Sequence, residues 1–159
     1  MENKLSSSAQ RVQDALTGLG YQNQVIEHAQ TTRSAREAAQ AIGCSLGQIV
    51  KSLIFRTRDS HRPVLVLASG PNRVNEARLG ERVMEAIERA EPDFVQSVTG
   101  FAIGGVPPIG HPTPMITFID EDLMRFEEIW AAAGTPNAVF KLTPTEMAAM
   151  THGQVVSIK

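Results

Sequence analysis

Two neighbouring apolar segments constrain the fold more than any other feature of the sequence. Residues 48–57 and 63–68 are rich in valine, isoleucine and leucine, and the polar stretch Arg-Asp-Ser-His-Arg separates them. This pattern is typical of two antiparallel strands joined by a short turn. Within residues 49–55 both alternating faces are largely apolar, as in a strand that is covered on both sides. We therefore expect a β-hairpin at the centre of a sheet.

Helices are expected around this hairpin. Residues 9–19 carry apolar residues at spacings of three and four, and residues 34–42 open with the capping-box pattern Ser-x-x-Glu. A final helix is predicted to begin after Thr143, with proline at its first position and glutamate closing a second capping box. Residues 75–90 have a helical composition, and 92–98 are expected to add a helical turn or two.

Short strands complete the expected fold, with Asp120 predicted to cap a short helix. The strands are predicted at residues 25–26, 115–119, 128–132 and 138–142. Helices and strands mix without a regular βαβ rhythm, which indicates the α+β class with a mixed sheet. The length of 159 residues fits a single domain over residues 1–159.

Composition and charge limit the possible partners. The 15 basic residues face 17 acidic ones, so long-range attraction to nucleic acid should be weak and any RNA contact confined to one end of the molecule. The apolar run Val64–Ala68 is far shorter than the roughly 20 residues of a membrane-spanning helix, so we expect no membrane association. A single cysteine and an N-terminus without an apolar leader fit a cytoplasmic protein. His28, His61 and His152 lack metal-ligand spacing, and we expect no metal.

Lys51 is the unusual residue of the first strand. Alternation places it on one face with Leu53 and Phe55. An ammonium among apolar side chains is costly unless it finds a partner or a water-filled cleft. It could extend to solvent from the strand end or pair with a carboxylate. Alternatively, it lines a pocket and meets an anionic part of a ligand.

A loop rich in glycine and proline, residues 100–112, is the second unusual segment. Gly104 and Gly105 allow backbone conformations closed to other residues, and the two prolines after Val106 stiffen the chain. Such a loop can be a plain structural turn. It can also present the N–H groups of residues 104–106 to an ester carbonyl and stabilise the charge that develops when water attacks it.

Lys51 within Gln48–Phe55 is followed about fifty residues later by Thr-Gly-Phe at 99–101 and Gly-Gly-Val-Pro-Pro-Ile-Gly at 104–110. This order and spacing resemble the YbaK/ProX family, which includes the editing domain of bacterial prolyl-tRNA synthetases and its free-standing relatives. The similarity runs from residues 32–43 through 137–142. It implies a partly barrel-like β-sheet surrounded by helices.

The resemblance also implies an activity. Members of the family hydrolyse the ester between a mismatched amino acid and the 3′ ribose of tRNA, without a metal or cofactor. It assigns Lys51 to the terminal adenosine or its phosphate, and the backbone of Gly104 and Gly105 to the aminoacyl group. Water, activated by a ribose hydroxyl, would attack the ester, so positioning and backbone electrostatics supply the acceleration. The further expected substrate contacts are Val106, Pro108, Gly110, His111 and Gly134. The expected partners are the 3′ end of aminoacyl-tRNA and a prolyl-tRNA synthetase.

One segment departs from the pattern of the family. Alanine-editing relatives carry a histidine, and cysteine-directed relatives a serine, where residues 131–137 read Ala-Ala-Ala-Gly-Thr-Pro-Asn. A small apolar wall is expected, which leaves the amino acid open among alanine, serine, threonine and cysteine.

Other functions remain open at this point. The chain could be a non-catalytic module that binds aminoacyl-tRNA or a synthetase, a small-molecule esterase, or a nucleotide-binding protein. His111 could be a solvated loop histidine, and Cys44 is expected to be a small buried apolar residue.

Overall fold

The computed structural model of the protein describes residues 4–29 and 34–159. Within these ranges one mixed sheet has the strand order β1-β7-β6-β2-β3-β5-β8, and β4 pairs with β2 beside this path. The strands are β1 (Val25–Glu27), β2 (Ile49–Thr57), β3 (Pro63–Ser69), β4 (Ile87–Arg89), β5 (Ile116–Asp120), β6 (Ile129–Ala132), β7 (Ala138–Leu142) and β8 (Gln154–Val156). The hairpin β2–β3 is antiparallel, whereas β2–β6, β3–β5 and β5–β8 are parallel.

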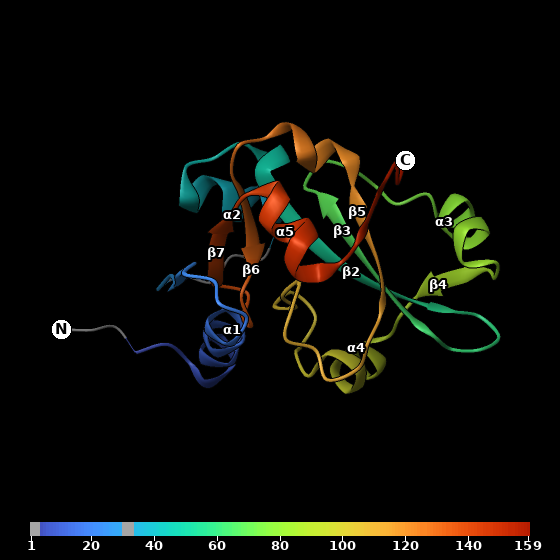
Figure 1. Ribbon diagram of the computed structural model, residues 1–159, viewed down its shortest axis with the longest axis horizontal. Helices are drawn as coiled ribbons and strands as arrows, with labels where there is room; N and C mark the ends of the chain where they lie inside the picture. The colour runs from blue at the N-terminus through green and yellow to red at the C-terminus, as the bar shows by residue number, and fades with distance from the viewer. Residues whose placement is uncertain (1–3, 30–33) are drawn as a thin grey trace.

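Helices surround this sheet, as Figure 1 shows. In that view α5 lies in front of the sheet, and α3 lies at the right beside β4. Contacts join α1 to β1, α2 to β2 and α3 to β4. The helices are α1 (Ser7–Gly18), α2 (Ala35–Ile42), α3 (Glu76–Val83), α4 (Pro92–Thr99) and α5 (Pro144–Thr151), with 3₁₀ turns η1 (Leu46–Gln48) and η2 (Glu121–Arg125). The expected α+β class, with a mixed sheet surrounded by helices, is confirmed.

The hairpin β2–β3 forms the centre of the core, as the sequence predicts. Val50 and Ile54 pack into one buried cluster together with residues of α1 and α4. Phe55, on the other face of β2, packs into a second cluster with Leu79 of α3. Each such buried side chain contributes roughly 1.5–3 kcal/mol to folding, so cover on both faces fixes the hairpin firmly.

The prediction of one helix over residues 75–90 is wrong in its second half. Helix α3 ends at Val83, and Met84 takes a left-handed conformation with φ of 62°. The chain then forms β4, which pairs antiparallel with residues 55–57 of β2. Ile87 is buried there with Phe55, so strand pairing and burial outweigh the local helical preference. Strand β8 was not predicted either; it is short and pairs parallel with β5.

Several helix ends follow the predicted caps. The Ser34 hydroxyl accepts a hydrogen bond from the Glu37 N–H (3.1 Å) at the start of α2. Thr143 and Glu146 form the reciprocal capping box of α5, with bonds of 2.8 and 3.1 Å. Asp120 caps η2 by accepting from the Asp122 N–H (2.9 Å). Each cap stabilises its helix by about 1 kcal/mol.

Glu85, between α3 and β4, holds the turn of the central hairpin. Its carboxylate accepts hydrogen bonds from the N–H groups of Asp59 and Ser60 and from the Ser60 hydroxyl, at 2.7 to 2.8 Å. These bonds, with those from Ser60 first, lower the pKa of Glu85 from 4.5 to about 2. Because the pKa in the folded chain lies below that in the unfolded chain, the bonds stabilise the turn at neutral pH. They are lost as the pH falls through about 2.

We therefore expect the amide proton signals of Asp59 and Ser60 to titrate with a midpoint near 2 in an NMR pH series. The variant Glu85→Gln should remove this titration. A midpoint near the ordinary value of 4.5 would show that these hydrogen bonds do not favour the ionised form of Glu85 over its protonated form.

Candidate active site

The site lies at a gap in the sheet beside β2. On the edge of β2 that faces away from β3, β6 pairs only with Ile49 and Val50. On the same edge β4 pairs only with residues 55–57, and the Ala90 N–H donates to the Ile54 carbonyl (3.1 Å). Among the described strands, none pairs with residues 51–53 on this edge. The segment that carries Lys51 therefore faces an opening in the sheet.

A cavity of about 500 Å³ occupies this opening. That volume is typical of a small-molecule site. Its walls come from β2, the start of α2, the glycine–proline loop and strands β6 and β7, and most are small and apolar. The lining residues are Ser34, Ala35, Ala38, Ile49 to Leu53, Ile103, Gly104, Val106, Trp130 to Ala132, Pro136, Ala138 and Val139.

Lys51 lines this cavity with a half-buried side chain. Its ammonium donates a hydrogen bond of 2.7 Å to the main-chain carbonyl of Asn72. No ion pair joins it to a carboxylate among the residues that the structure describes. Burial lowers the pKa of Lys51, and the positive charges of Arg89 and Arg73 lower it further, whereas the charge of Asp120 opposes the shift. Because no carboxylate of the described residues pairs with it, the Lys51 ammonium can bind an anionic group of a ligand.

The loop brings two main-chain donors to the site. Gly104 and Val106 line the cavity with Lys51. Their N–H groups have no hydrogen-bond partner within the described part of the chain. The N–H of Gly105 donates to the Ala102 carbonyl (3.1 Å). The expectation that Gly105 presents a free amide is therefore wrong, because a local turn already uses that donor.

Gly105 instead fixes the loop against the turn after β6. The Gly134 N–H donates to the Gly105 carbonyl (2.8 Å). A Cβ at position 105 would lie 2.7 Å from the Gly134 oxygen. Gly134 itself has φ of 101° and lies against α1, where a Cβ would meet the Ser8 carbonyl oxygen at 2.5 Å. Gly134 supports the loop and is not part of the cavity wall.

Three of the residues expected to contact the substrate lie outside the cavity of Lys51. Pro108, Gly110 and His111 line a separate hollow of about 290 Å³. His111 is half-buried, its Nε2 lies 2.6 Å from the Pro107 carbonyl oxygen, and burial lowers its pKa. His111 therefore braces the loop and is neither a solvated histidine nor part of the cavity of Lys51.

Ser52 is a residue that the sequence analysis missed. Its Oγ is buried and has no hydrogen-bond partner among the described residues. Ser52 lines the cavity, and with Gly104 and Val106 it also lines a small adjoining hollow that reaches Arg89. A buried hydroxyl without a partner is uncommon, and a bound ligand or water can supply one. The sequence feature that could have identified Ser52 is its hydroxyl between Val50 and Ile54 on an otherwise apolar face of the strand.

The remaining candidate features are the cysteine, a metal site and a membrane-spanning helix. Cys44 packs against the cluster of Ala38, Ala39 and Ile49 and is half-buried, less than the sequence predicts, and burial raises its pKa. Within residues 4–29 and 34–159, no three His, Cys, Asp or Glu side chains gather into a group that could hold a metal ion. None of the helices in these ranges is long and apolar enough to cross a membrane.

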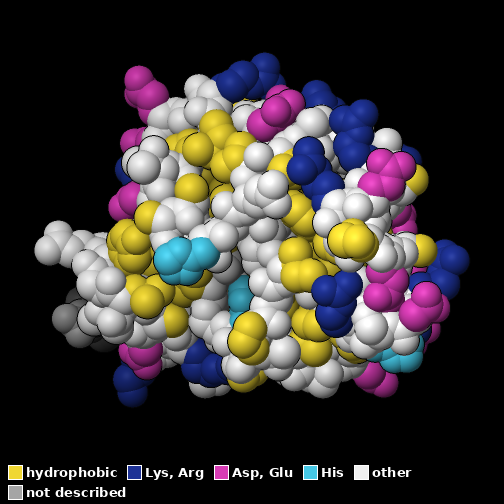
Figure 2. Space-filling model, turned by 45° about the vertical axis from the view of Figure 1, so that its right-hand side comes forward, with side chains coloured by type: hydrophobic (Ala, Val, Ile, Leu, Met, Phe, Trp, Pro, Cys, Tyr) yellow, Lys and Arg dark blue, Asp and Glu magenta, His cyan; other side chains and the backbone are white. Residues whose placement is uncertain are grey.

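The surface carries no continuous basic area on the face that holds α3 and the tip of the hairpin. Figure 2 shows lysine and arginine side chains there interspersed with aspartate and glutamate. This agrees with the net charge of −2.

The chain is similar in sequence and fold to several known proteins. The protein YwhH of Bacillus subtilis, whose function is uncharacterized, is 29% identical over 93% of this chain and 94% of its own. EbsC of Enterococcus faecalis, named as a candidate Cys-tRNA(Pro)/Cys-tRNA(Cys) deacylase, is 25% identical over 79% of this chain and 76% of its own. A crystal structure described as a candidate trans-editing enzyme for prolyl tRNA synthetase superposes with a TM-score of 0.93. It is 47% identical over 98% of this chain and 99% of that one.

The family profile described as "Aminoacyl-tRNA editing domain" matches residues 29–150. This range contains the cavity, Lys51 and the whole glycine–proline loop. The match confirms the resemblance to the YbaK/ProX family. The chain therefore belongs to the family of aminoacyl-tRNA editing domains.

Proposed function

We propose that this protein is an aminoacyl-tRNA deacylase that acts in trans on mischarged tRNA. The observation that carries the proposal is that Lys51 lines one apolar cavity together with Gly104 and Val106, whose amides have no hydrogen-bond partner in the described part of the chain. A cation and two fixed donors suit a substrate with a phosphate at one end and an ester carbonyl at the other.

In the proposed reaction the cavity receives the 3′-terminal adenosine with its amino acid. Lys51 binds a phosphate or the adenosine, and the N–H groups of Gly104 and Val106 face the ester carbonyl. Water, hydrogen-bonded to the neighbouring ribose hydroxyl, attacks the carbonyl carbon. As the C–O bond to the ribose breaks, that hydroxyl accepts a proton from the water and passes its own proton to the leaving ribose oxygen. The products are the free amino acid and a tRNA with its ribose hydroxyl restored. Preorganised amides stabilise the oxyanion, so the proposal needs neither a metal nor a nucleophilic side chain.

Charge near the cavity mouth supports binding of the RNA end. Arg73 and Arg89 are exposed, and both lie close enough to Lys51 for their charges to lower its pKa. Three cations together attract the phosphates of the terminal nucleotides. Because the net charge is −2, this local group has to supply the attraction, and a prolyl-tRNA synthetase that delivers the tRNA would assist it.

The walls of the cavity favour a small amino acid. Ala35, Ala38, Ala131 and Ala132 give it an apolar surface, and two serines, Ser34 and Ser52, also line it. The names of EbsC and of the solved relative refer to tRNA for proline or its synthetase. We therefore propose alanine, serine, threonine or cysteine on tRNA for proline as the substrate.

A panel of mischarged tRNAs tests the function. The purified protein is incubated with tRNA for proline that carries labelled alanine, serine, threonine or cysteine, with prolyl-tRNA as the matched control. We expect release of at least one of the four amino acids and no release of proline. Retention of the tRNA without release would support the non-catalytic binding module instead. Turnover of small esters without tRNA would support an esterase.

Ser52→Ala tests the unpaired hydroxyl. If Ser52 Oγ bonds the substrate, its loss should lower kcat/KM by about 2- to 10-fold, the size of one neutral hydrogen bond. Ser45→Ala, which removes a hydroxyl at the η1 turn outside the cavity, is the matched control and should leave kcat/KM unchanged. Equal rates for Ser52→Ala and the native protein would show that water alone satisfies this hydroxyl.

A further inference from the structure

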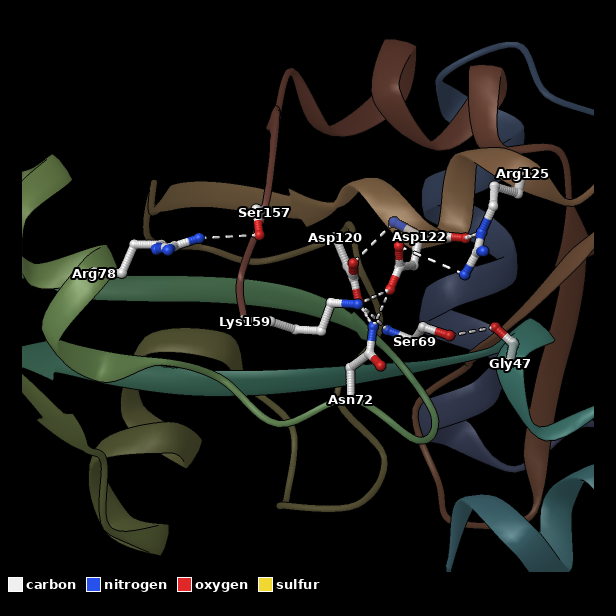
Figure 3. A network of polar contacts seen from close by, with 9 residues as sticks. All are labelled: Gly47, Ser69, Asn72, Arg78, Asp120, Asp122, Arg125, Ser157 and Lys159. Carbon is white, nitrogen blue, oxygen red and sulfur yellow. Dashed lines mark hydrogen bonds and ion pairs between the residues drawn. The ribbon is translucent and has the colours of Figure 1, made fainter.

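Figure 3 shows a network of polar side chains around Asn72, the residue to which Lys51 is hydrogen-bonded. Asn72 follows β3, and its main-chain carbonyl accepts the hydrogen bond from the Lys51 ammonium (2.7 Å). The side-chain amide of the same residue donates to Asp120 Oδ2 (2.8 Å) and to Asp122 Oδ2 (2.7 Å). The acceptor that holds Lys51 is therefore fixed from behind by two carboxylates.

Asp120 is the deeper of these carboxylates. It is fully buried at the end of β5, and its Oδ2 also accepts from the Ser69 N–H (3.0 Å). A buried carboxylate is costly unless hydrogen bonds satisfy it. Its contacts to Ser69 and Asn72 together fix both ends of the turn that presents the carbonyl to Lys51.

The two carboxylates differ in their other partners. Asp122 pairs with Lys159 (2.9 Å) and with Arg125 (3.5 Å), and the hydrogen bonds from Lys159 and then Asn72 lower its pKa. Asp120 makes no ion pair within the described ranges. The negative charge of Asp120 is therefore less neutralised by a direct partner than that of Asp122.

The geometry points to Asp120, acting through Asn72, as a positioning residue that fixes both the place and the positive charge of Lys51. Three charged groups act on the ammonium from the elements around it: Arg89 of β4, Arg73 after β3 and Asp120 of β5. The two arginines repel it, and Asp120 alone of the three favours its protonated form. The catalytic consequence rests on the proposed function, but the effect on Lys51 does not.

The effect on Lys51 can be measured without tRNA. In protein labelled with ¹³C and ¹⁵N at lysine, the Lys51 signal is identified by its loss in Lys51→Arg and followed with pH. Asp120→Asn keeps the shape of the side chain and removes its charge, so the midpoint of Lys51 should move to lower pH. Asp122 accepts a hydrogen bond from the same Asn72 side-chain amide, so Asp122→Asn is the matched control. We expect no shift of the Lys51 midpoint in that variant.

A shift of equal size in both variants, or none in Asp120→Asn, would overturn the inference. In the deacylation assay, the loss of rate at alkaline pH should begin at lower pH in Asp120→Asn alone. A native protein that hydrolyses no mischarged tRNA would refute the proposed function, while the NMR titration would still decide the inference.

Asn72→Ala is a second variant that leaves the buried carboxylate in place. Loss of two hydrogen bonds to carboxylates should free the turn and lower kcat/KM by about tenfold. In a Lys51→Ala background the same change should have little further effect, because both act through one ammonium. An equal further loss in that background would show a purely structural role and overturn the inference.

Discussion

Lys51→Ala should lower kcat/KM for mischarged tRNA by about 10- to 100-fold. A hydrogen bond to a charged group contributes about 1.5–3 kcal/mol, and about 1.4 kcal/mol corresponds to a factor of ten. The variant loses the cation that lines the cavity and donates to the Asn72 carbonyl. Because Lys51 forms no ion pair with a carboxylate in the described part of the chain, its removal breaks no salt bridge. We therefore expect the melting temperature to stay close to that of the native protein.

Lys141→Ala is the matched control for this change. Lys141 forms an exposed ion pair with Glu128 (3.5 Å) and does not line the cavity, so its removal deletes the same charge elsewhere. Such surface pairs contribute only about 0–1 kcal/mol. Deacylation should be unchanged in Lys141→Ala. Similar losses in both variants would mean that total charge, and not the position of Lys51, governs binding of the tRNA.

The affinity for tRNA, measured at increasing salt concentration, tests whether Lys51 contacts a phosphate. If Lys51 contacts a phosphate, the native protein should lose affinity as salt rises, and Lys51→Ala should show a shallower dependence. A steeper or equal slope in the variant would assign the phosphate contact to another cation, such as Arg73 or Arg89.

The local signals in the sequence predicted the fold where the determining contacts are local. The caps at Ser34, Thr143 and Asp120 depend on residues two or three positions away, and all three form as expected. Strand β4 depends on residues 55–57, about thirty positions earlier in the chain, and β8 depends on β5. No local pattern contains those partners, so the helical composition of residues 75–90 misled the prediction.

The candidate site was predictable to a similar degree. The motif order predicted that Lys51 and the loop belong together, and the structure places Lys51, Gly104 and Val106 on one cavity. Which way each loop residue faces depends on the turn from Ala102 to Gly105 and on the contact with Gly134. Those contacts direct Pro108, Gly110 and His111 into another hollow. The role of Asn72 could not be found from sequence, because its main-chain carbonyl carries the contact.

Gly105→Ala should disrupt the loop more than any other single methyl group added there. The new Cβ would lie 2.7 to 2.8 Å from the carbonyl group of Gly134 and from Thr135 Cα. All three are main-chain atoms, so no side chain can rotate away. The turn at Gly134 cannot retreat either, because it lies against Ser8 of α1. Overpacking of this kind costs about 1–3 kcal/mol. A displacement of about 1 Å in the amides of Gly104 and Val106 would lower kcat by about 100-fold.

Gly18→Ala provides the matched control, since it adds the same methyl group where nothing lies within 4 Å. Gly18 ends α1, so alanine should stabilise the helix by about 0.5–1 kcal/mol and leave deacylation unchanged. Thermal unfolding and single-turnover deacylation of both variants compare the two sites directly. If Gly105→Ala keeps native activity despite a lowered melting temperature, the loop amides do not stabilise the transition state. The electrostatic part of the mechanism would then have to come from elsewhere in the cavity, with Ser52 as the next donor to test.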